Sequence, residues 1–308
     1  MKNCLNRTDM FKWDMFKRRV YQNCSKRYEV AAKLVKPLSL SLLISFIPFT
    51  MSTSHAGETT VQAVYKINAP VGSGKFHFAS AQSGNRYKMQ GSAKFKAFLG
   101  FYKWNSSVAS NGYIYGYKPR PNIYAFSARS DKKAEAIRMN FSRNGVKKIK
   151  AVPPNRPHPK RIAVNKSHLR NVVDPLSAML AFTDKAPSLT NGTRACNRSI
   201  KIFDGRQRFN VTLSFKRKAY AELSNGQSRT AFVCRAKYRP LAGHKRKNKA
   251  VSYMANSKGL EIWLVPLPKA KMYVPYKIVI PIMIGTATAE LASFRISGSK
   301  TGNIALAR

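Results

Sequence analysis

The chain has 308 residues and a formal net charge of +44 at pH 7, from 56 Lys and Arg against 12 Asp and Glu. So few carboxylates leave little for acid–base chemistry, and the sequence contains no Gly-x-Ser-x-Gly, His-Glu-x-x-His or Gly-x-x-x-x-Gly-Lys-Ser/Thr motif. We therefore expect a protein that is not an enzyme, with no cofactor and no metal site.

The first 56 residues have the pattern of a cleavable signal peptide. A basic stretch precedes an apolar run at residues 38–49 that is too short to span a bilayer as a helix. Ser54 and Ala56 are the small residues that signal peptidase reads. We expect cleavage after Ala56 and a periplasmic protein, with an uncleaved anchor as the alternative.

The positive charge remains after the leader is removed. Residues 57–308 keep 46 Lys and Arg against nine Asp and Glu. In an exported chain this balance favours an anionic envelope lipid or glycan as partner, and no nucleic acid is expected. The alternative is that these side chains are the solvated outer faces of strands. The densest basic run provides the candidate anion contacts, which are His244, Lys245, Arg246 and Lys247.

Two cysteines remain in the mature chain, Cys196 and Cys234. An even pair in an oxidising compartment predicts one disulfide. The chain-entropy account of cross-linking gives it about 3–4 kcal/mol.

Alternation of apolar and polar residues with a period of two predicts strands. The pattern is clear at residues 137–142, 209–215 and 232–238, and Tyr113, Tyr115 and Tyr117 form one further row. Asn-Gly or Asp-Gly pairs at 111–112, 144–145, 204–205 and 225–226 indicate hairpins or loops. The chain is therefore predicted to be mainly β, with a single curved, mostly antiparallel sheet or an open barrel.

The centre of the chain breaks the strand pattern. Residues 152–159 contain four prolines and are predicted to form an extended loop between the halves of a single all-β domain at 57–308. Further on, Asp174 can cap a short helix whose first residue is Pro175, and this helix is expected to pack on the sheet. Asp204 is assigned to a hairpin turn. Both aspartates thus have structural roles.

The segment at residues 276–284 is apolar on both faces. Such a strand is either covered on both sides by protein, with the short helix as the candidate cover, or it faces a cavity or partner. Pro281 predicts an edge strand or a bulge. The candidate ligand-lining residues are Tyr276, Ile278, Ile280 and Ile282 of this segment together with Trp104.

Several short motifs also carry a family resemblance. They are Val173-Asp-Pro-Leu-Ser-Ala178, Cys196, Phe203-Asp-Gly-Arg206, Cys234, Tyr238-x-Pro-x-x-Gly243, Val274-Pro-Tyr276 and Gly285, in this order. Together they resemble the envelope family called domain of unknown function 3108, over most of the mature chain. The resemblance implies an exported bacterial protein, mainly β, with no established activity. A more distant similarity to open sheets that cradle acyl chains is an analogy of fold only.

These observations predict a non-enzymatic envelope binding module for an amphiphilic or anionic ligand such as a lipid, glycan or lipoprotein. The first alternative is a basic protein that docks on anionic lipid, polysaccharide or a partner protein, with peripheral membrane contact, and encloses nothing. The second is an unrecognised hydrolase, which requires Asp174 or Asp204 in a cleft beside His77 or His168.

Overall fold

The computed structural model describes residues 57–223, 226–298 and 302–307. The predicted signal peptide at 1–56 and the cleavage after Ala56 lie outside this part of the chain. Within it, no helix is both long enough and apolar enough to cross a bilayer.

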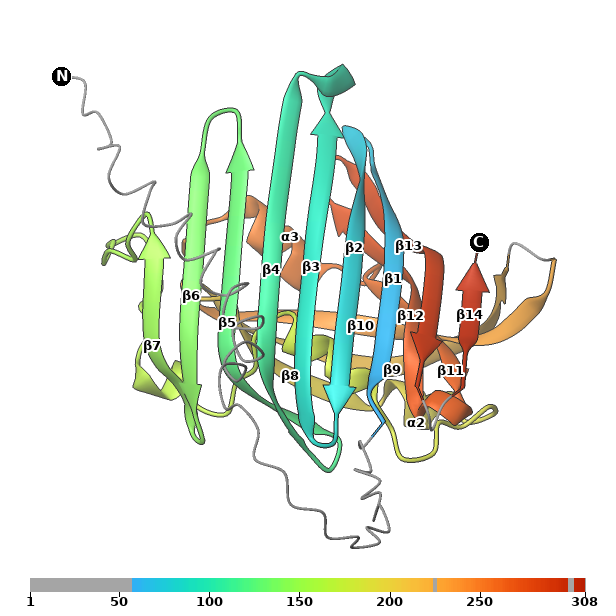
Figure 1. Ribbon diagram of the computed structural model, residues 1–308. Helices are drawn as coiled ribbons and strands as arrows, with labels where there is room; N and C mark the ends of the chain where they lie inside the picture. The colour runs from blue at the N-terminus through green and yellow to red at the C-terminus, as the bar shows by residue number, and fades with distance from the viewer. Residues whose placement is uncertain (1–56, 224–225, 299–301, 308) are drawn as a thin grey trace, which may run out of the picture. The chain divides into compact units, whose positions relative to one another are not determined.

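Fourteen antiparallel strands of the described residues form one sheet (Figure 1). Their order in the sheet is β7-β6-β5-β4-β3-β2-β1-β13-β12-β11-β10-β9-β8, and β14 also pairs with β13. The two ends of this order, β7 and β8, do not pair with each other, so the sheet is open. The mainly β, antiparallel fold class is confirmed. The strands are β1 (Thr59–Ala69), β2 (Gly72–Ser83), β3 (Arg86–Ala97), β4 (Tyr102–Tyr115), β5 (Lys118–Ser130), β6 (Ala134–Ser142), β7 (Gly145–Val152), β8 (Arg198–Phe203), β9 (Arg208–Glu222), β10 (Ser228–Ala242), β11 (Glu261–Leu267), β12 (Met272–Ile282), β13 (Gly285–Ser297) and β14 (Ile304–Ala307).

The period-two alternation of the sequence becomes an inner and an outer face. On β3, Tyr87 and Met89 are buried whereas Lys88 and Gln90 are exposed. The strands predicted around 137–142, 209–215 and 232–238 are also confirmed, although in β10 the residues 231–234 are buried on both faces. One turn prediction is wrong. The Asn-Gly pair at 111–112 lies inside β4, where the ladder with β5 shifts register, so the pair marks a bulge in a continuous strand.

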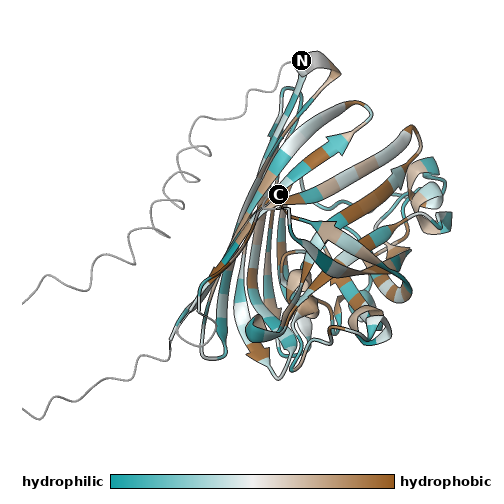
Figure 2. Ribbon diagram, turned by 90° about the vertical axis from the view of Figure 1, so that its right-hand side faces the viewer, coloured by the Kyte–Doolittle hydropathy of each residue, from teal (hydrophilic) through white to brown (hydrophobic). Residues whose placement is uncertain are grey.

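The sheet curls so that β8–β12 pack against the inner face of β1–β6. Gly205, in the turn between β8 and β9, lies against Ile137 of β6. The Tyr65 hydroxyl on β1 donates to the Pro275 carbonyl on β12 at 2.9 Å. Figure 1 shows β8–β10 behind β1–β6, and Figure 2 shows the layers from the side, with hydrophobic and hydrophilic residues alternating along the strands.

Short helical turns connect the strands. They are η1 (Phe98–Gly100), η2 (Lys166–Leu169), η3 (Ser177–Phe182), α2 (Gly192–Cys196), α3 (Lys249–Asn256) and η4 (Pro268–Ala270). The helix predicted after Asp174 is η3, a 3-10 turn and not an α-helix. The proline-rich loop at 152–159 is exposed throughout, as a segment with few backbone donors must be.

Residues 170–173 connect the two outer strands of the sheet. Arg170 forms a bridge with Gly145 at the start of β7, and Val173 forms a parallel bridge with Ile202 on β8. The bonds include Asn171 N–H to Asn144 O at 3.1 Å and Val173 N–H to Lys201 O at 2.9 Å. One short segment thus holds the two ends of an open sheet near each other.

The disulfide prediction agrees with the structure. Cys196 and Cys234 have sulfur atoms 2.00 Å apart and Cα atoms 5.3 Å apart, within the range that a disulfide requires. Both are fully buried, and the bond fastens α2 to β10.

Strand β12 is not an edge strand, so the edge alternative predicted from Pro281 is wrong, whereas a bulge is present: the ladder with β11 shifts register at Tyr276. The strand lies between β11 and β13, and Pro281 itself pairs with Thr286. The proline is tolerated because the β11 ladder ends with Glu261 opposite Val279, before it reaches Pro281. The η3 segment meets β12 through a bridge from Thr183 to Met272, at the first residue of the strand.

Candidate functional site

A buried polar network lies between β3, β4 and η3. The Ser177 hydroxyl donates to Asp174 Oδ2 at 2.6 Å, and the Ser110 hydroxyl donates to the same atom at 3.0 Å. Tyr87 Oη and Ser177 Oγ are 2.7 Å apart. Asp174 Oδ1 accepts the backbone N–H groups of Leu176 and Ser177 at 3.0 and 2.8 Å. Asp174 is therefore the predicted cap of the turn, and it also ties the turn to two strands.

Burial raises the pKa values of the titratable groups in this network. Removal from water raises the pKa of Asp174, although the hydrogen bonds from Ser177, Ser110 and Leu176 act in the opposite direction. Burial likewise raises the pKa of the Tyr87 hydroxyl. Asp174 and Ser177 are both 0 % exposed, so the network is closed to solvent, and it fastens η3 to β3 and β4.

Asp204 occupies the predicted hairpin turn between β8 and β9. Its Oδ1 accepts the N–H groups of Arg206 and Gln207, and burial raises the pKa of its carboxyl. The hydrogen-bond partners found for Asp174 and Asp204 include no histidine. Within the described residues, no cluster of three His, Cys, Asp or Glu side chains can hold a metal ion.

A row of apolar residues crosses the inner face from β4 to β12, and we call it the inner row. Each member lies directly opposite the next in the ladder, and all are half-buried. The inner row consists of Trp104, Phe95, Gly74, Ile67, Ala289 and Ile278. At roughly 4.8 Å between neighbouring strands, it is about 24 Å long along the sheet.

Small residues flank Ile67 in the middle of the inner row. Gly74 and Ala289 flank Ile67, and Gly72 and Ala97 follow one step nearer the hairpin turns. A Cβ on Gly74 would lie 2.4 Å from the Lys94 carbonyl oxygen, so the close approach of β3 requires glycine here. Trp104 and Phe95 therefore stand next to each other at the β4 end and Ile278 at the β12 end, with Gly74, Ile67 and Ala289 between them.

The structure places the five predicted ligand-lining residues on this same face. Ile278 is one end of the inner row and Trp104 the other, while Ile280 and Ile282 continue along β12 and are half-buried. Tyr276 is different. It is buried, and its hydroxyl donates to the Glu222 carbonyl at 2.9 Å. Tyr276 is therefore part of the hydrophobic core and is not available to line a ligand site.

A basic residue, Lys258, lies near the Ile280 end of the apolar strand β12. Helix α3 contributes Met254, which packs on the same buried cluster as Ile280. The segment after α3 reaches β12, because a Cβ on Gly259 would lie 3.6 Å from Pro281 Cγ. Lys258, next to Gly259, is exposed. A cationic group is thus available beside an apolar strand end.

The predicted anion contacts at 244–247 form a separate surface. Lys245, Arg246 and Lys247 are exposed, whereas His244 is buried at 9 % exposure. The backbone of Lys245 forms an isolated antiparallel β-bridge with Arg161. The Arg161 guanidinium donates to the Gly243 carbonyl at 2.7 Å. Three of the four predicted residues are thus available to a ligand at this loop.

The outer face carries lysines that the sequence did not single out. Lys66, Lys75 and Lys94 stand directly opposite one another on β1, β2 and β3, although like charges in this arrangement repel. Their one acidic neighbour in the ladder is Glu290, which pairs with Lys66 and forms an ion pair with Lys277 at 2.8 Å.

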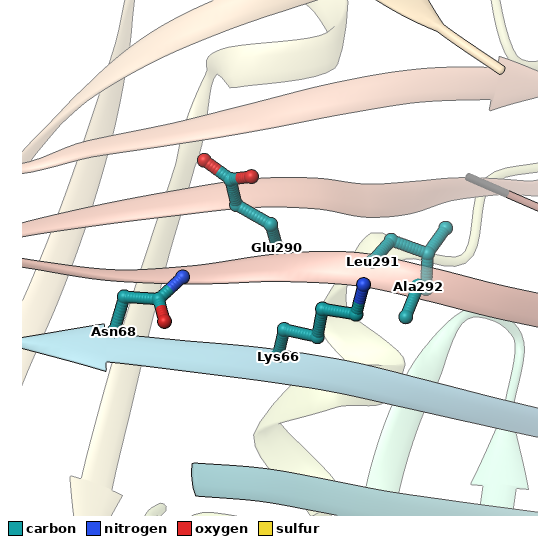
Figure 3. Close-up of a pocket in the computed structure, with 5 residues that line it drawn as sticks. All are labelled: Lys66, Asn68, Glu290, Leu291 and Ala292. Carbon is teal, nitrogen blue, oxygen red and sulfur yellow. The ribbon is translucent and has the colours of Figure 1, made fainter. Parts of the chain in front are cut away.

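Two hollows lie on this outer face. One, of about 160 Å³, is lined by Lys66, Asn68, Glu290, Leu291 and Ala292 (Figure 3). The other, of about 530 Å³, is lined by Ser73, Gly74, Lys75, His77, Ser92, Lys94 and Lys96. His77 thus faces lysines and is remote from the buried aspartates.

The fold and these surfaces define a class of protein, an open antiparallel sheet with an apolar inner face and a basic outer face. A sequence model of the family described as protein of unknown function (DUF3108) matches residues 60–292, and the chain belongs to this family. The resemblance found in the motifs is therefore confirmed. Comparison with curated proteins and with solved structures gave no match.

Proposed function

We propose that this protein is a non-enzymatic binding module that holds the acyl chain of an anionic amphiphile along the inner row. The observation that carries the proposal is the inner row itself, a continuous line of half-buried apolar residues across six strands. Elsewhere on this face Tyr87, Met89 and Met139 are fully covered.

The dimensions of the inner row support an acyl chain as ligand. One leaflet of a bilayer has a hydrocarbon depth of about 15 Å, and the row extends about 24 Å, so one chain can lie along it in full contact. Gly74 and Ala289 flank Ile67 in the middle of the row, while Trp104 and Phe95 at one end and Ile278 at the other give the chain its bulkier contacts.

The charge of the chain supports an anionic head group. Exposed Lys258 lies beside the β12 end, within a domain that has 46 Lys and Arg against nine Asp and Glu. The exported location belongs to the same proposal, and it rests on the leader pattern and the buried cysteine pair.

Native mass spectrometry of the protein isolated from its own cells, with lipid extraction, tests the proposal. We expect one amphiphile per protein, and we expect Ile278→Asn to lose it. Val279→Asn is the matched control, because Val279 is the next residue of β12 and faces the other side. A wild-type protein that carries no amphiphile and binds no added fatty acid overturns the proposal, as does equal loss in both variants.

A further inference from the structure

Three hairpin turns meet at one end of the sheet and present apolar side chains to solvent. Phe98 N–H, in the β3–β4 turn, donates to the Val71 carbonyl of the β1–β2 turn at 2.9 Å. A Cβ on Gly285, at the β12–β13 turn, would lie 2.9 Å from Pro70 Cγ. The β1–β2 turn thus links the other two.

The exposed residues of these turns are unusually apolar. Phe98 is 61 % exposed and Phe101 86 %, and on the β12–β13 turn Met283 is 55 % and Ile284 60 % exposed. With Pro70 they form one surface, which we call the apolar tip. Phe98 also has a positive φ of 51°, a conformation that is rare for a bulky residue. The fold therefore maintains a strained backbone that holds an aromatic ring in solvent.

Lysines on the outer face follow directly behind the apolar tip. Lys96 and Lys103 are opposite each other on β3 and β4, each two residues from a tip phenylalanine, or about 7 Å along the strand. Lys94 is four residues from Phe98, about 13 Å. Lys132 and Lys133 are exposed in the adjacent β5–β6 turn. In this part of the surface the acidic group is Asp131, which accepts the N–H of Lys103.

We propose that the apolar tip docks the protein on the surface of an anionic phospholipid bilayer. Phe98, Phe101, Met283 and Ile284 enter the boundary between head groups and acyl chains, and the lysines behind them meet lipid phosphates. The head-group zone is about 5–8 Å thick on each side of the hydrocarbon, which matches the distance from the phenylalanines to the first lysines. Interfacial binding combines Phe or Leu with Lys or Arg in this way, whereas lysine is depleted at protein–protein interfaces.

Flotation of the purified protein with phospholipid vesicles tests the docking surface. The probes are phosphatidylcholine vesicles with and without about one third phosphatidylglycerol, at low and high salt. We expect binding to the anionic vesicles alone, weakened by salt. Phe98→Ser with Phe101→Ser lowers affinity on the order of tenfold per ring, and Lys94→Gln, Lys96→Gln and Lys103→Gln about fivefold per lysine.

Matched controls come from other exposed parts of the chain. Tyr220→Ser removes an aromatic ring that is 71 % exposed on β9, and Lys147→Gln with Lys148→Gln removes exposed charges on β7. Both controls keep wild-type affinity. Equal loss in tip and control variants overturns the proposal, as does equal binding to neutral and anionic vesicles, or binding to lipopolysaccharide or a protein partner without vesicle binding.

The docking surface is separable from the proposed inner-row ligand. Ile278→Asn keeps vesicle binding while it loses the bound amphiphile, and the Phe98 and Phe101 double variant keeps the amphiphile while it loses the vesicles. A negative result for amphiphile binding leaves the vesicle-binding proposal standing, and the reverse also holds, so the two proposals are tested independently.

Discussion

The inner face of the sheet has two regions that share strands and alternation but differ in what covers them. Near η3, Tyr87, Ser110 and Met139 are covered and all polar groups of the Asp174 network are paired. Toward the hairpin turns, the same strands carry the half-buried inner row and the exposed apolar tip. The inner side chains of an alternating strand are thus buried where the chain folds back over them, and they remain partly exposed where it does not.

The difference separates a region that stabilises the fold from the region where we propose that the ligand binds. Buried and fully paired groups stabilise the fold, and their loss is costly. Half-exposed apolar residues contribute less to stability because much of their surface remains in water in the folded state. The open region can therefore be altered for binding at a small cost to the fold.

The largest effect is expected from Asp174→Ala, which breaks the covered region. Two hydroxyls and two backbone N–H groups lose their acceptor in a buried site. At about 1–3 kcal/mol for each unsatisfied group, and with some re-pairing among the hydroxyls, we expect a loss of about 3–5 kcal/mol in the free energy of unfolding by urea. Asp131→Ala, at an exposed turn, is the control and should cost less than about 1 kcal/mol. A similar loss in both variants would show that the network is unimportant.

A second comparison uses the same truncation chemistry in both regions. Met139 is 0 % exposed, and Met139→Ala should cost about 2–5 kcal/mol through the cavity it leaves. Ile278→Ala, in the half-buried inner row, should cost about 1 kcal/mol. Thermal unfolding of the two variants measures the difference. Equal losses would mean that the inner row is as well covered as the core, which contradicts the binding proposal.

The smallest effect is the pH dependence of the covered region. Because burial raises the pKa of Asp174 in the folded state above its ordinary value near 4, the folded protein binds the proton more tightly than the unfolded chain. The stabilisation is therefore fully present at low pH and is lost as pH rises through the folded pKa, by up to about 1.4 kcal/mol per pH unit. Asp174→Asn should remove this slope, as urea unfolding at a series of pH values would show. A variant with the wild-type slope would assign the dependence to another group.

Local patterns predicted the strands, the turn at Asp204 and the cap role of Asp174, because each depends on neighbours in the chain. The turn at 111–112 and the edge strand at Pro281 are mispredicted because the partner strand decides them: β5 shifts register at the first position, and β11 pairs with β12 but stops before the second. The same holds for the Asp174 network, since Ser110 and Tyr87 are 64 and 87 residues away along the chain.

The inner row could be predicted only in part. Ile278 and Trp104 were named as lining residues from local alternation, and both are in it. The row that joins them depends on five strand registers, and Gly74 and Ala289 give no local signal of their place in it. The apolar tip was missed for a related reason, because three separate turns become neighbours only when the sheet forms.

The bridges made by residues 170–173 also change what the two edges of the sheet offer to another chain. An open sheet has two unpaired outer strands, and each offers backbone groups to a strand from another chain. Here Arg170 occupies the start of β7 and Val173 occupies β8, while exposed lysines line the rest of β7. The segment therefore shortens the edge with which a strand of another chain can pair, and this lowers the tendency of an open sheet to associate edge to edge.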